Sequence, residues 1–158
     1  MPPTDIVVDI LFDAEITCPL SRQEIHESVT MAALHRGFSK GQIGVRVTDD
    51  AKIHAINRDH LNHDYPTDVI SFDYGSFAPN IEGELVVSVD TAREKAEEYA
   101  WDEKYELLLY IVHGTLHIAG MDDQNSNARN QMRQAEVRVL GELGISLPER
   151  CSPDGGIR

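Results

Sequence analysis

Four stretches of the chain have the hydrophobic pattern of β-strands. Residues 5–12 are apolar and β-branched, residues 42–48 alternate between apolar and polar positions, and residues 83–90 are nearly continuous in apolar content. Residues 67–74 form another short apolar run, and the glycine and proline that follow it predict a loop over residues 75–82. The pattern therefore predicts four strands, of which the last two are consecutive in the chain.

Five stretches have the pattern of α-helices. Ser21 and Glu24 have the spacing of a capping box, in which each side chain bonds the backbone of the other residue at a helix start. The fourth helix is apolar on most sides, which is typical of a helix in a protein core. The last helix is amphipathic and is expected to stop at Gly144. The predicted helices span residues 21–38, 49–62, 91–100, 102–120 and 127–144.

The order of these elements predicts an α+β, or mixed α/β, fold. We expect a small mixed four-stranded sheet packed around the buried central helix, with about five helices in all. A chain of 158 residues is typical of one domain, which we place at residues 1–146. Residues 147–158 have the composition of a loose C-terminal tail.

Composition and charge narrow the function classes. The net charge of −13 argues against a non-specific binder of polyanions, because affinity for phosphates comes mostly from lysine and arginine. The arginines at 129, 133 and 138 are interpreted as a solvated helix face. Cys18 and Cys151 lie far apart, which favours a reducing compartment. The acidic N-terminus is unlike a signal peptide and no apolar run could span a bilayer, so we expect a cytoplasmic protein.

The stretch HGTLHIAGMDD, which begins at His113, carries the candidate chemistry. On a helix, His113 and His117 lie one turn apart on one face, so both imidazoles can hold one metal ion. Gly120 can adopt a left-handed backbone and turn the chain, which brings Asp123 back over that face. Zn²⁺ accepts two imidazoles and one carboxylate, and three protein ligands leave one position open for water. Asp122 is the competing third ligand, and otherwise has a turn-capping or supporting role.

Gly114 argues against a protease. The spacing of the possible ligands resembles the zinc motif of metzincin proteases, in which a glutamate follows the first histidine and acts as general base. Gly114 stands at that position and cannot move a proton, so peptide hydrolysis by that mechanism lacks its base. On spacing alone, His113 and His117 could also be uncharged histidines of a buried helix.

Three blocks of the sequence resemble the YbeY family, the metal-dependent endoribonucleases of ribosomal RNA maturation. HGTLHIAGMDD is close to the family's HGxLHLxGYDH, and INRDHLNHDYPTDVISFDY is close to its LN-x-x-Y-R-x-x-D-x-PTDVLSF. EGELVVSVDTAREKA is close to its GDIxIS segment followed by a helix, and Met132 and Glu136 fit its M-x3-E pattern. The resemblance runs from about residue 5 to residue 145.

The resemblance implies an α/β fold with a mixed sheet and one divalent ion, Zn²⁺, in a cleft. It also implies cleavage of single-stranded RNA, trimming of the ends of small-subunit ribosomal RNA, and ribosome quality control. The implied partners are ribosomal RNA and ribosome or small-subunit assembly components, with no membrane and no DNA. One alternative is a ribosome-associated assembly factor whose nuclease activity is weak or lost, and a weaker one is a zinc metalloprotease.

The sequence departs from the family pattern at two positions. Asp123 stands where the family usually has a third histidine, and its negative charge makes a bound ion a weaker Lewis acid. Leu61 aligns with the family's arginine, which would be expected to hold a phosphate or its developing charge. His60, His63 and Arg58 lie within one helical turn or in the adjoining loop and are candidate replacements.

The resemblance also assigns residues to the cleft. Asp68, Ser71 and Glu84 are implied candidates for orienting a ligand or a water molecule. Without the family, Thr67 and Asp68 could equally just start a strand and cap its turn. The predicted site residues are His113, Asp68 and His60 for catalysis, His113, His117 and Asp123 for the metal, and Thr67, Ser71, Glu84, Gly114, Gly120 and Asp122 around them.

Overall fold

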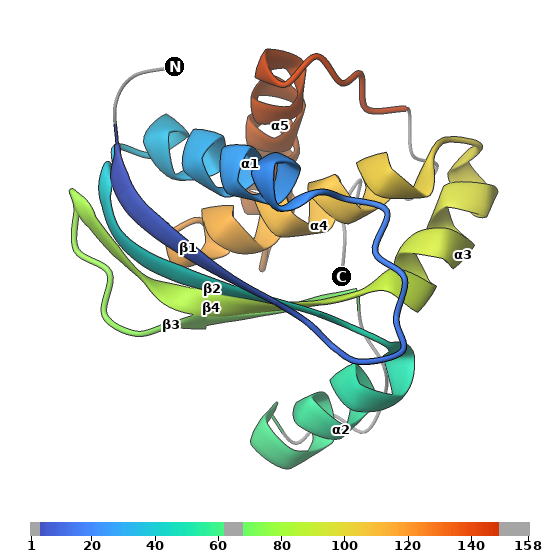
Figure 1. The fold of residues 1–158 in the computed structure, drawn as a ribbon. Helices are drawn as coiled ribbons and strands as arrows, with labels where there is room; N and C mark the ends of the chain where they lie inside the picture. The colour runs from blue at the N-terminus through green and yellow to red at the C-terminus, as the bar shows by residue number, and fades with distance from the viewer. Residues whose placement is uncertain (1–3, 62–67, 149–158) are drawn as a thin grey trace.

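The computed structural model describes residues 4–61 and 68–148, which form a four-stranded sheet with helices on both faces (Figure 1). Three helices, α1, α4 and α5, lie above the sheet, and α2 lies below it (Figure 1). The elements are β1 (Asp5–Phe12), α1 (Arg22–His35), β2 (Lys40–Thr48), α2 (Asp50–Leu61), β3 (Val69–Asp73), β4 (Asn80–Ser88), α3 (Val89–Tyr99), α4 (Glu103–Ile118) and α5 (Ser126–Glu142).

The sheet is mixed, with the strand order β1-β2-β4-β3. β1, β2 and β4 are parallel, and β3 pairs antiparallel with β4 at the sheet edge. Parallel neighbours need crossover connections, which the intervening helices supply, whereas the short segment between β3 and β4 suits a hairpin. The described residues thus confirm the predicted mixed fold with four strands and five helices.

Helix α4 is the central element of the core. Its residues from Glu106 to Leu116 are all buried, which confirms the expectation from its apolar sequence. The helix lies above β3 and β4, where Leu85 and Val69 approach it at Gly114 (Figure 1). Below the sheet, α2 covers a smaller apolar cluster of Ile53, Ile70 and Val86. The upper face of β4 therefore supports α4, and the lower face supports α2.

The boundaries of β4 and α3 correct the sequence prediction. β4 begins at Asn80 rather than at residue 83, because residues 80–82 pair with the start of β2. β4 ends at Ser88, whose hydroxyl accepts a hydrogen bond from the backbone N–H of Thr91 at 3.3 Å and caps α3. Turn-forming residues near Pro79 hid the first pairing, and the apolar Val89 hid the helix start. The predicted capping box at Ser21 is confirmed.

Helix α3 ends at an alanine in a strained conformation. Ala100 has φ +56° and ψ +48°, the left-handed region that favours glycine. Replacing Ala100 with glycine is expected to raise the free energy of unfolding by about 0.5–1 kcal/mol. The removed strain, about 1–2 kcal/mol, exceeds the extra chain entropy that glycine loses on folding. Urea denaturation followed by circular dichroism measures the change.

The exposed Glu94 in the middle of the same helix supplies the control. Glycine at that position should lower the free energy of unfolding by about 0.5–1 kcal/mol, because there the backbone is ordinary helix. If both glycine variants lower stability equally, the left-handed end of α3 carries no strain that glycine relieves.

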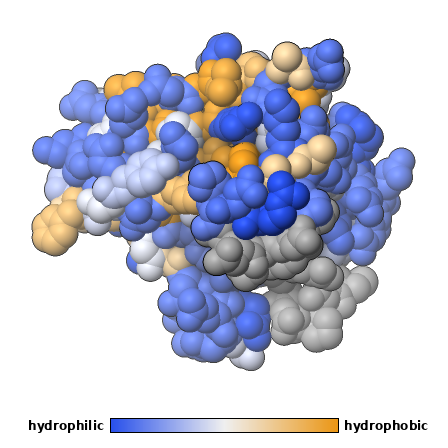
Figure 2. All heavy atoms as spheres, turned by 90° about the horizontal axis from the view of Figure 1, so that it is seen from below, coloured by the Kyte–Doolittle hydropathy of each residue, from blue (hydrophilic) through white to orange (hydrophobic). Residues whose placement is uncertain are grey.

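The surface below the sheet is mainly hydrophilic, with smaller hydrophobic areas between the charged side chains (Figure 2). This view agrees with the excess of acidic residues in the chain. In residues 4–61 and 68–148, no helix is both long enough and apolar enough to cross a membrane.

Candidate metal centre

The last turns of α4 place two imidazoles against each other. His113 is 2% exposed, and its Nε2 atom lies 3.0 Å from Nε2 of His117. The two rings meet edge to face, with centroids 4.6 Å apart and planes at 80°. A helix turn separates the residues, as the spacing of four predicts. The Nε2 atoms of both rings face each other, so both could bind one ion.

Gly120 reverses the chain directly after this pair. Its φ is +96°, the left-handed conformation that the sequence predicted. Its N–H donates to the carbonyl of His117, and the N–H of Met121 donates to that of Leu116, both at 3.0 Å. These two bonds form the Schellman arrangement that closes many helices. The turn also brings the carbonyl of Met121 back to His117, where it accepts a hydrogen bond from Nδ1 at 2.9 Å.

Beyond the turn, Asp123 completes a triangle of possible ligand atoms. Its Oδ2 lies 3.3 Å from Nε2 of His117 and 3.6 Å from Nε2 of His113. Two atoms bound about 2.1 Å from a tetrahedral ion lie roughly 3.4 Å apart, so the triangle has a suitable size for Zn²⁺. In the part of the chain that the structure describes, these three residues form the one cluster of this kind. His113, His117 and Asp123 could therefore hold a metal ion.

The hydrogen bonds of the two rings also fit a metal. Nδ1 of His113 lies 2.6 Å from Oε2 of Glu136, to which it donates, and Nδ1 of His117 donates to the Met121 carbonyl. A neutral ring with hydrogen on Nδ1 has a lone pair on Nε2. Two such lone pairs 3.0 Å apart repel each other unless a positive charge lies between them. The arrangement, with a carboxylate or carbonyl behind each ring, is the one that orients metal-binding histidines.

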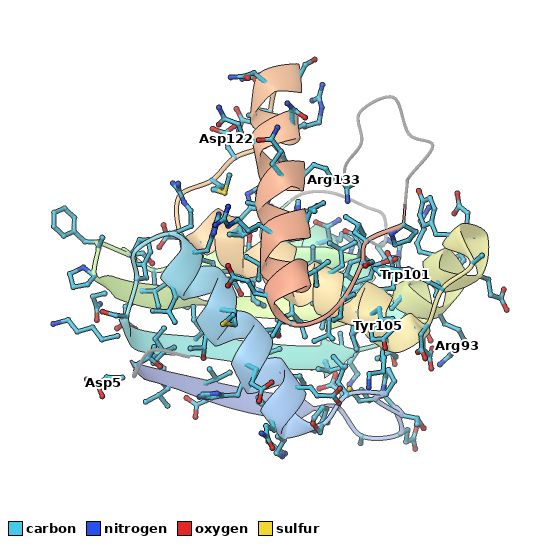
Figure 3. All side chains as sticks on the ribbon, turned by 90° about the horizontal axis from the view of Figure 1, so that it is seen from above. Asp5, Arg93, Trp101, Tyr105, Asp122 and Arg133 are labelled. Atoms are coloured by element: carbon cyan, nitrogen blue, oxygen red, sulfur yellow. The ribbon has the colours of Figure 1, made fainter. Side chains whose placement is uncertain are left out.

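Glu136 contacts the candidate site, although the sequence analysis placed it in the family pattern without giving it a role. It is 1% exposed on α5, and its other oxygen lies 3.1 Å from Nη1 of Arg133. Figure 3 shows Arg133 on α5 and Asp122 in the connection that leads into this helix. A carboxylate at an inward position of an amphipathic helix, four residues after Met132, was the available signal.

The charges around the rings favour a positive charge at this point. Burial of His113 favours its neutral form, but the bond to Glu136 and the nearby carboxylates of Asp68 and Asp123 outweigh it. The pKa of His113 is consequently raised above its ordinary value. The hydrogen bond from His117 holds the pKa of Asp123 below its ordinary value, against the opposing effect of burial. A divalent ion would meet an anionic site.

Two other predicted site residues lie near the possible ligands: Asp68 is close to the His113 ring, and Ser71 is on the face of the sheet that α4 covers. Asp68 influences the charge of His113, and its Oδ1 accepts a hydrogen bond from the N–H of Val69 at 2.8 Å. Ser71 pairs with Leu85, and cross-strand partners point to the same face. Asp122 is exposed, and its Oδ1 accepts a hydrogen bond from the N–H of Gln124 at 3.3 Å. Its geometry is that of a turn residue.

The structure does not bring Glu84 and His60 to the three possible ligands. Glu84 follows the alternation of β4 and points to the α2 side, where its Cγ approaches Gly44. It also accepts a hydrogen bond from Tyr74 Oη at 3.4 Å. His60 is exposed on the last turn of α2, below the sheet (Figure 1). Thr67, His63, Cys151 and the side chain of Leu61 lie outside the described residues.

Gly114 has a packing role that its sequence position did not reveal. A Cβ atom there would lie 2.6 Å from Cδ2 of Leu85 and 3.0 Å from Cγ2 of Val69. Replacing Gly114 with alanine is expected to lower the free energy of unfolding by about 1–3 kcal/mol, because overpacking outweighs the better helix propensity of alanine. Thermal unfolding of the metal-free protein measures the loss.

The matched control is Gly141 of α5, where an added Cβ atom meets nothing within 4 Å. Alanine at that position should raise the free energy of unfolding by up to about 1 kcal/mol. Equal stabilisation by both alanine variants would show that α4 and the sheet have room to separate at Gly114.

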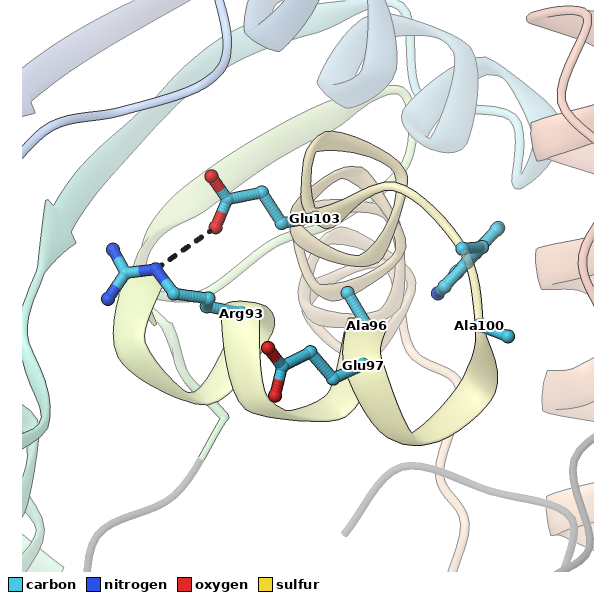
Figure 4. A pocket seen from close by; sticks show the side chains of 6 residues that line it. Arg93, Ala96, Glu97, Ala100 and Glu103 are labelled. Atoms are coloured by element: carbon cyan, nitrogen blue, oxygen red, sulfur yellow. Dashed lines mark ion pairs between the residues drawn. The ribbon is translucent and has the colours of Figure 1, made fainter.

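The hollow at the junction of α3 and α4 is separate from this cluster. It has a volume of about 410 Å³ and is lined by Arg93, Glu97, Trp101 and Glu103, among others (Figure 4). Nε of Arg93 lies 3.4 Å from Oε2 of Glu103, an ion pair across its rim. Glu103 is ten residues before His113 on α4, a distance of roughly 15 Å along the helix. The hollow therefore contributes no group to the possible metal ligands.

Comparison with known proteins identifies the same family by its family model and by individual relatives. The family model described as Endoribonuclease YbeY matches residues 13–144. An Endoribonuclease YbeY of Rhodopirellula baltica is 47% identical over 158 residues, covering 93% of this chain and 81% of the relative. One of Elusimicrobium minutum is 34% identical over 142 residues, covering 85% and 98%.

Solved structures with a similar fold include one from Thermotoga maritima. The solution structure of TM1509 from Thermotoga maritima superimposes with a TM-score of 0.59 and covers 87% of this chain and 92% of its own. Its sequence is 23% identical, so this likeness supports the architecture alone.

Proposed function

The chain belongs to the Endoribonuclease YbeY family, and from this premise we propose that it is a metal-dependent enzyme that cleaves single-stranded RNA. The observation that carries the proposal is the triangle of ligand atoms from His113, His117 and Asp123, with sides of 3.0, 3.3 and 3.6 Å. Membership of the family supports RNA cleavage as the reaction. The triangle of ligand atoms supports a divalent ion as the group that assists this reaction.

The residues around the triangle would orient the metal ligands and the attacking water for hydrolysis. A bound divalent ion would polarise a phosphate oxygen and lower the pKa of a water molecule. Glu136 and the Met121 carbonyl hold the two rings with Nε2 facing inward. Asp68 is our candidate for orienting the water. The reaction joins a water oxygen to phosphorus and breaks one ester bond between phosphorus and a ribose oxygen, which takes up a proton.

We further propose Zn²⁺ as the ion and ribosomal RNA as the substrate. Two imidazoles and one carboxylate are an accepted Zn²⁺ ligand set, although they also suit other divalent metals. The three family blocks support a role in trimming small-subunit ribosomal RNA, with ribosomal assembly components as partners in the cytoplasm. The net charge of −13 favours such a specific substrate over general binding to nucleic acid.

A cleavage assay with three matched substrates tests the enzyme proposal. The substrates are a labelled single strand of small-subunit ribosomal RNA, the same strand annealed to its complement, and DNA of the same sequence. We expect cleavage of the single-stranded RNA, loss of cleavage after chelation, and recovery with Zn²⁺. The double variant His113→Ala, His117→Ala should be inactive, whereas His35→Ala, an exposed histidine of α1, should cleave normally. Equal cleavage by the double variant would contradict the proposal.

A further inference from the structure

The outer edge of β1 carries backbone groups that the sheet does not pair. β1 comes first in the strand order β1-β2-β4-β3, so only one of its two sides faces another strand (Figure 1). The N–H groups of Asp5 and Asp13 donate to the carbonyls of Ser39 and Val47, at 2.9 and 3.0 Å, on the β2 side. Backbone groups alternate along a strand, so the odd-numbered residues of β1 face β2 and the even-numbered residues face outward.

Arg22 closes one end of this outer edge. Its Nη1 donates to the carbonyl of Ile10 at 3.0 Å, and its guanidinium lies 4.9 Å from the ring centroid of Phe12. The bond to Ile10 agrees with the alternation, because it reaches an even-numbered residue. Within residues 4–61 and 68–148, the structure shows no hydrogen bond to the N–H or carbonyl of Val8, or to the N–H of Ile10. An unpaired stretch of this kind can bind another strand.

The side chains along this stretch differ between the two faces of the sheet. Val8 and Ile10 pack against the main core. Val7 points to the opposite face and is 55% exposed. Asp5 and Asp9, both exposed, lie on either side of Val7 on that face. The open stretch of β1 therefore presents an apolar side chain between two carboxylates.

The charge of this stretch indicates which partner fits it. β1 contains two aspartates and no basic residue, and the chain has a net charge of −13. Two copies paired through β1 would place these carboxylates opposite apolar side chains or opposite each other, and facing like charges destabilise a strand pair. The phosphates of a nucleic acid would be repelled in the same way. A basic strand would instead gain an opposite-charge pair at each aspartate.

We propose that the edge of β1 binds an extended segment of a basic partner protein, which joins the sheet as a fifth strand. The segment has a lysine or arginine opposite Asp5 and another opposite Asp9, with three apolar residues between them. Its backbone pairs with Val8 in the antiparallel direction, which is the slightly more stable one. The bond from Arg22 to Ile10 limits the pairing to this short stretch.

Synthetic peptides and the full chain test the proposal. The probe peptide has the core Lys-Val-Val-Val-Lys. One control peptide has glutamate in place of both lysines, and another is methylated on the backbone nitrogens of the second and fourth core residues, which would face the edge. We expect only the unmethylated lysine peptide to bind. Its binding should slow hydrogen exchange at the amides of Val8 and Ile10, whereas those of Val7 and Asp9, which already face β2, should change little.

A charge reversal on the protein gives the matched variants. The double variant Asp5→Lys, Asp9→Lys should bind the lysine peptide about 5- to 50-fold more weakly, because two attractive cross-strand pairs become repulsive. The same variant should bind the glutamate peptide instead. Glu94→Lys, at an exposed position of α3, should bind both peptides as the unaltered protein does. Fluorescence titration of the labelled peptides measures these affinities.

The other outcomes would overturn the proposal in different ways. No binding of the lysine peptide, equal binding of the methylated peptide, or unchanged exchange at Val8 would reject strand addition. Protection of Val8 by a second copy, as protein concentration rises, or by single-stranded RNA would reject a basic protein as the partner. The inference goes beyond the proposed function and does not depend on it. Gly114, next to His113, packs against Val69 of β3, which is the opposite edge of the sheet, and peptide binding is measured without RNA cleavage.

Discussion

Replacing Asp123 with alanine is expected to lower the affinity for the divalent ion by more than about 100-fold and to abolish RNA cleavage. Removing a group that merely supports a ligand costs about 10- to 100-fold, and here one of three direct ligands would be lost. The two imidazoles would remain as ligands, but with one fewer negative charge beside them. Metal analysis after dialysis, together with the cleavage assay, measures both effects.

Two further variants make this prediction specific. Asp122→Ala should keep the metal and the activity, because Asp122 is exposed and bonds only the turn in the contacts that the structure shows. Asp123→His should also keep the metal, because three imidazoles are an accepted Zn²⁺ set. The bound water should then be slightly more acidic, which would shift the acidic limb of the pH profile, where activity rises with pH, towards lower pH. Metal loss in Asp122→Ala but not in Asp123→Ala would exchange the roles of the two aspartates.

Replacing Glu136 with glutamine is expected to weaken both metal binding and stability. Glutamine preserves the volume but not the charge, so His113 and Arg133 both lose their contact with the Glu136 carboxylate. We expect metal affinity to fall by about 10- to 100-fold. The free energy of unfolding should fall by about 3 kcal/mol, the cost of breaking a buried ion pair from one side. Calorimetric metal titration and urea denaturation measure the two losses.

A second substitution separates these two effects. Adding Arg133→Met to Glu136→Gln removes the guanidinium that faces position 136, so part of the stability should recover while metal affinity stays low. The control is Glu142→Gln on the same helix, because Glu142 is 46% exposed and lies 3.9 Å from Arg138. Its effect on stability should stay within about 0.5 kcal/mol. Recovery of metal affinity in the double variant would mean that Glu136 does not act through His113.

The sequence was sufficient to predict elements whose signals are local. The capping box at Ser21, the buried character of α4 and the turn at Gly120 each depend on residues close together in the chain. The same holds for the meeting of His113, His117 and Asp123, which span eleven residues. The start of β4 was missed because its first residues are held by pairing with β2, about forty positions earlier.

The groups around the triangle could not be placed from local spacing. Glu136 lies 23 residues after His113, and their bond depends on how α5 crosses α4. Gly114 looked like a missing catalytic base, but in space it is the point where α4 touches Leu85. The family resemblance implied that Glu84 lies in the cleft, yet strand alternation turns its side chain to the other face of the sheet. Long-range packing therefore decides which polar residues can assist the metal.

The hydrogen bond between His113 and Glu136 couples the packing of α5 on α4 to the binding of an ion at the possible metal ligands. If the ion binds more tightly when α5 is packed against α4, then by thermodynamic linkage the bound ion stabilises that packing by the same free energy. Scarcity of the ion would loosen α5 first, and its backbone amides would then exchange with solvent faster than those of α4. The supply of a trace element would in this way determine how well the seventeen residues of α5 are protected from exchange.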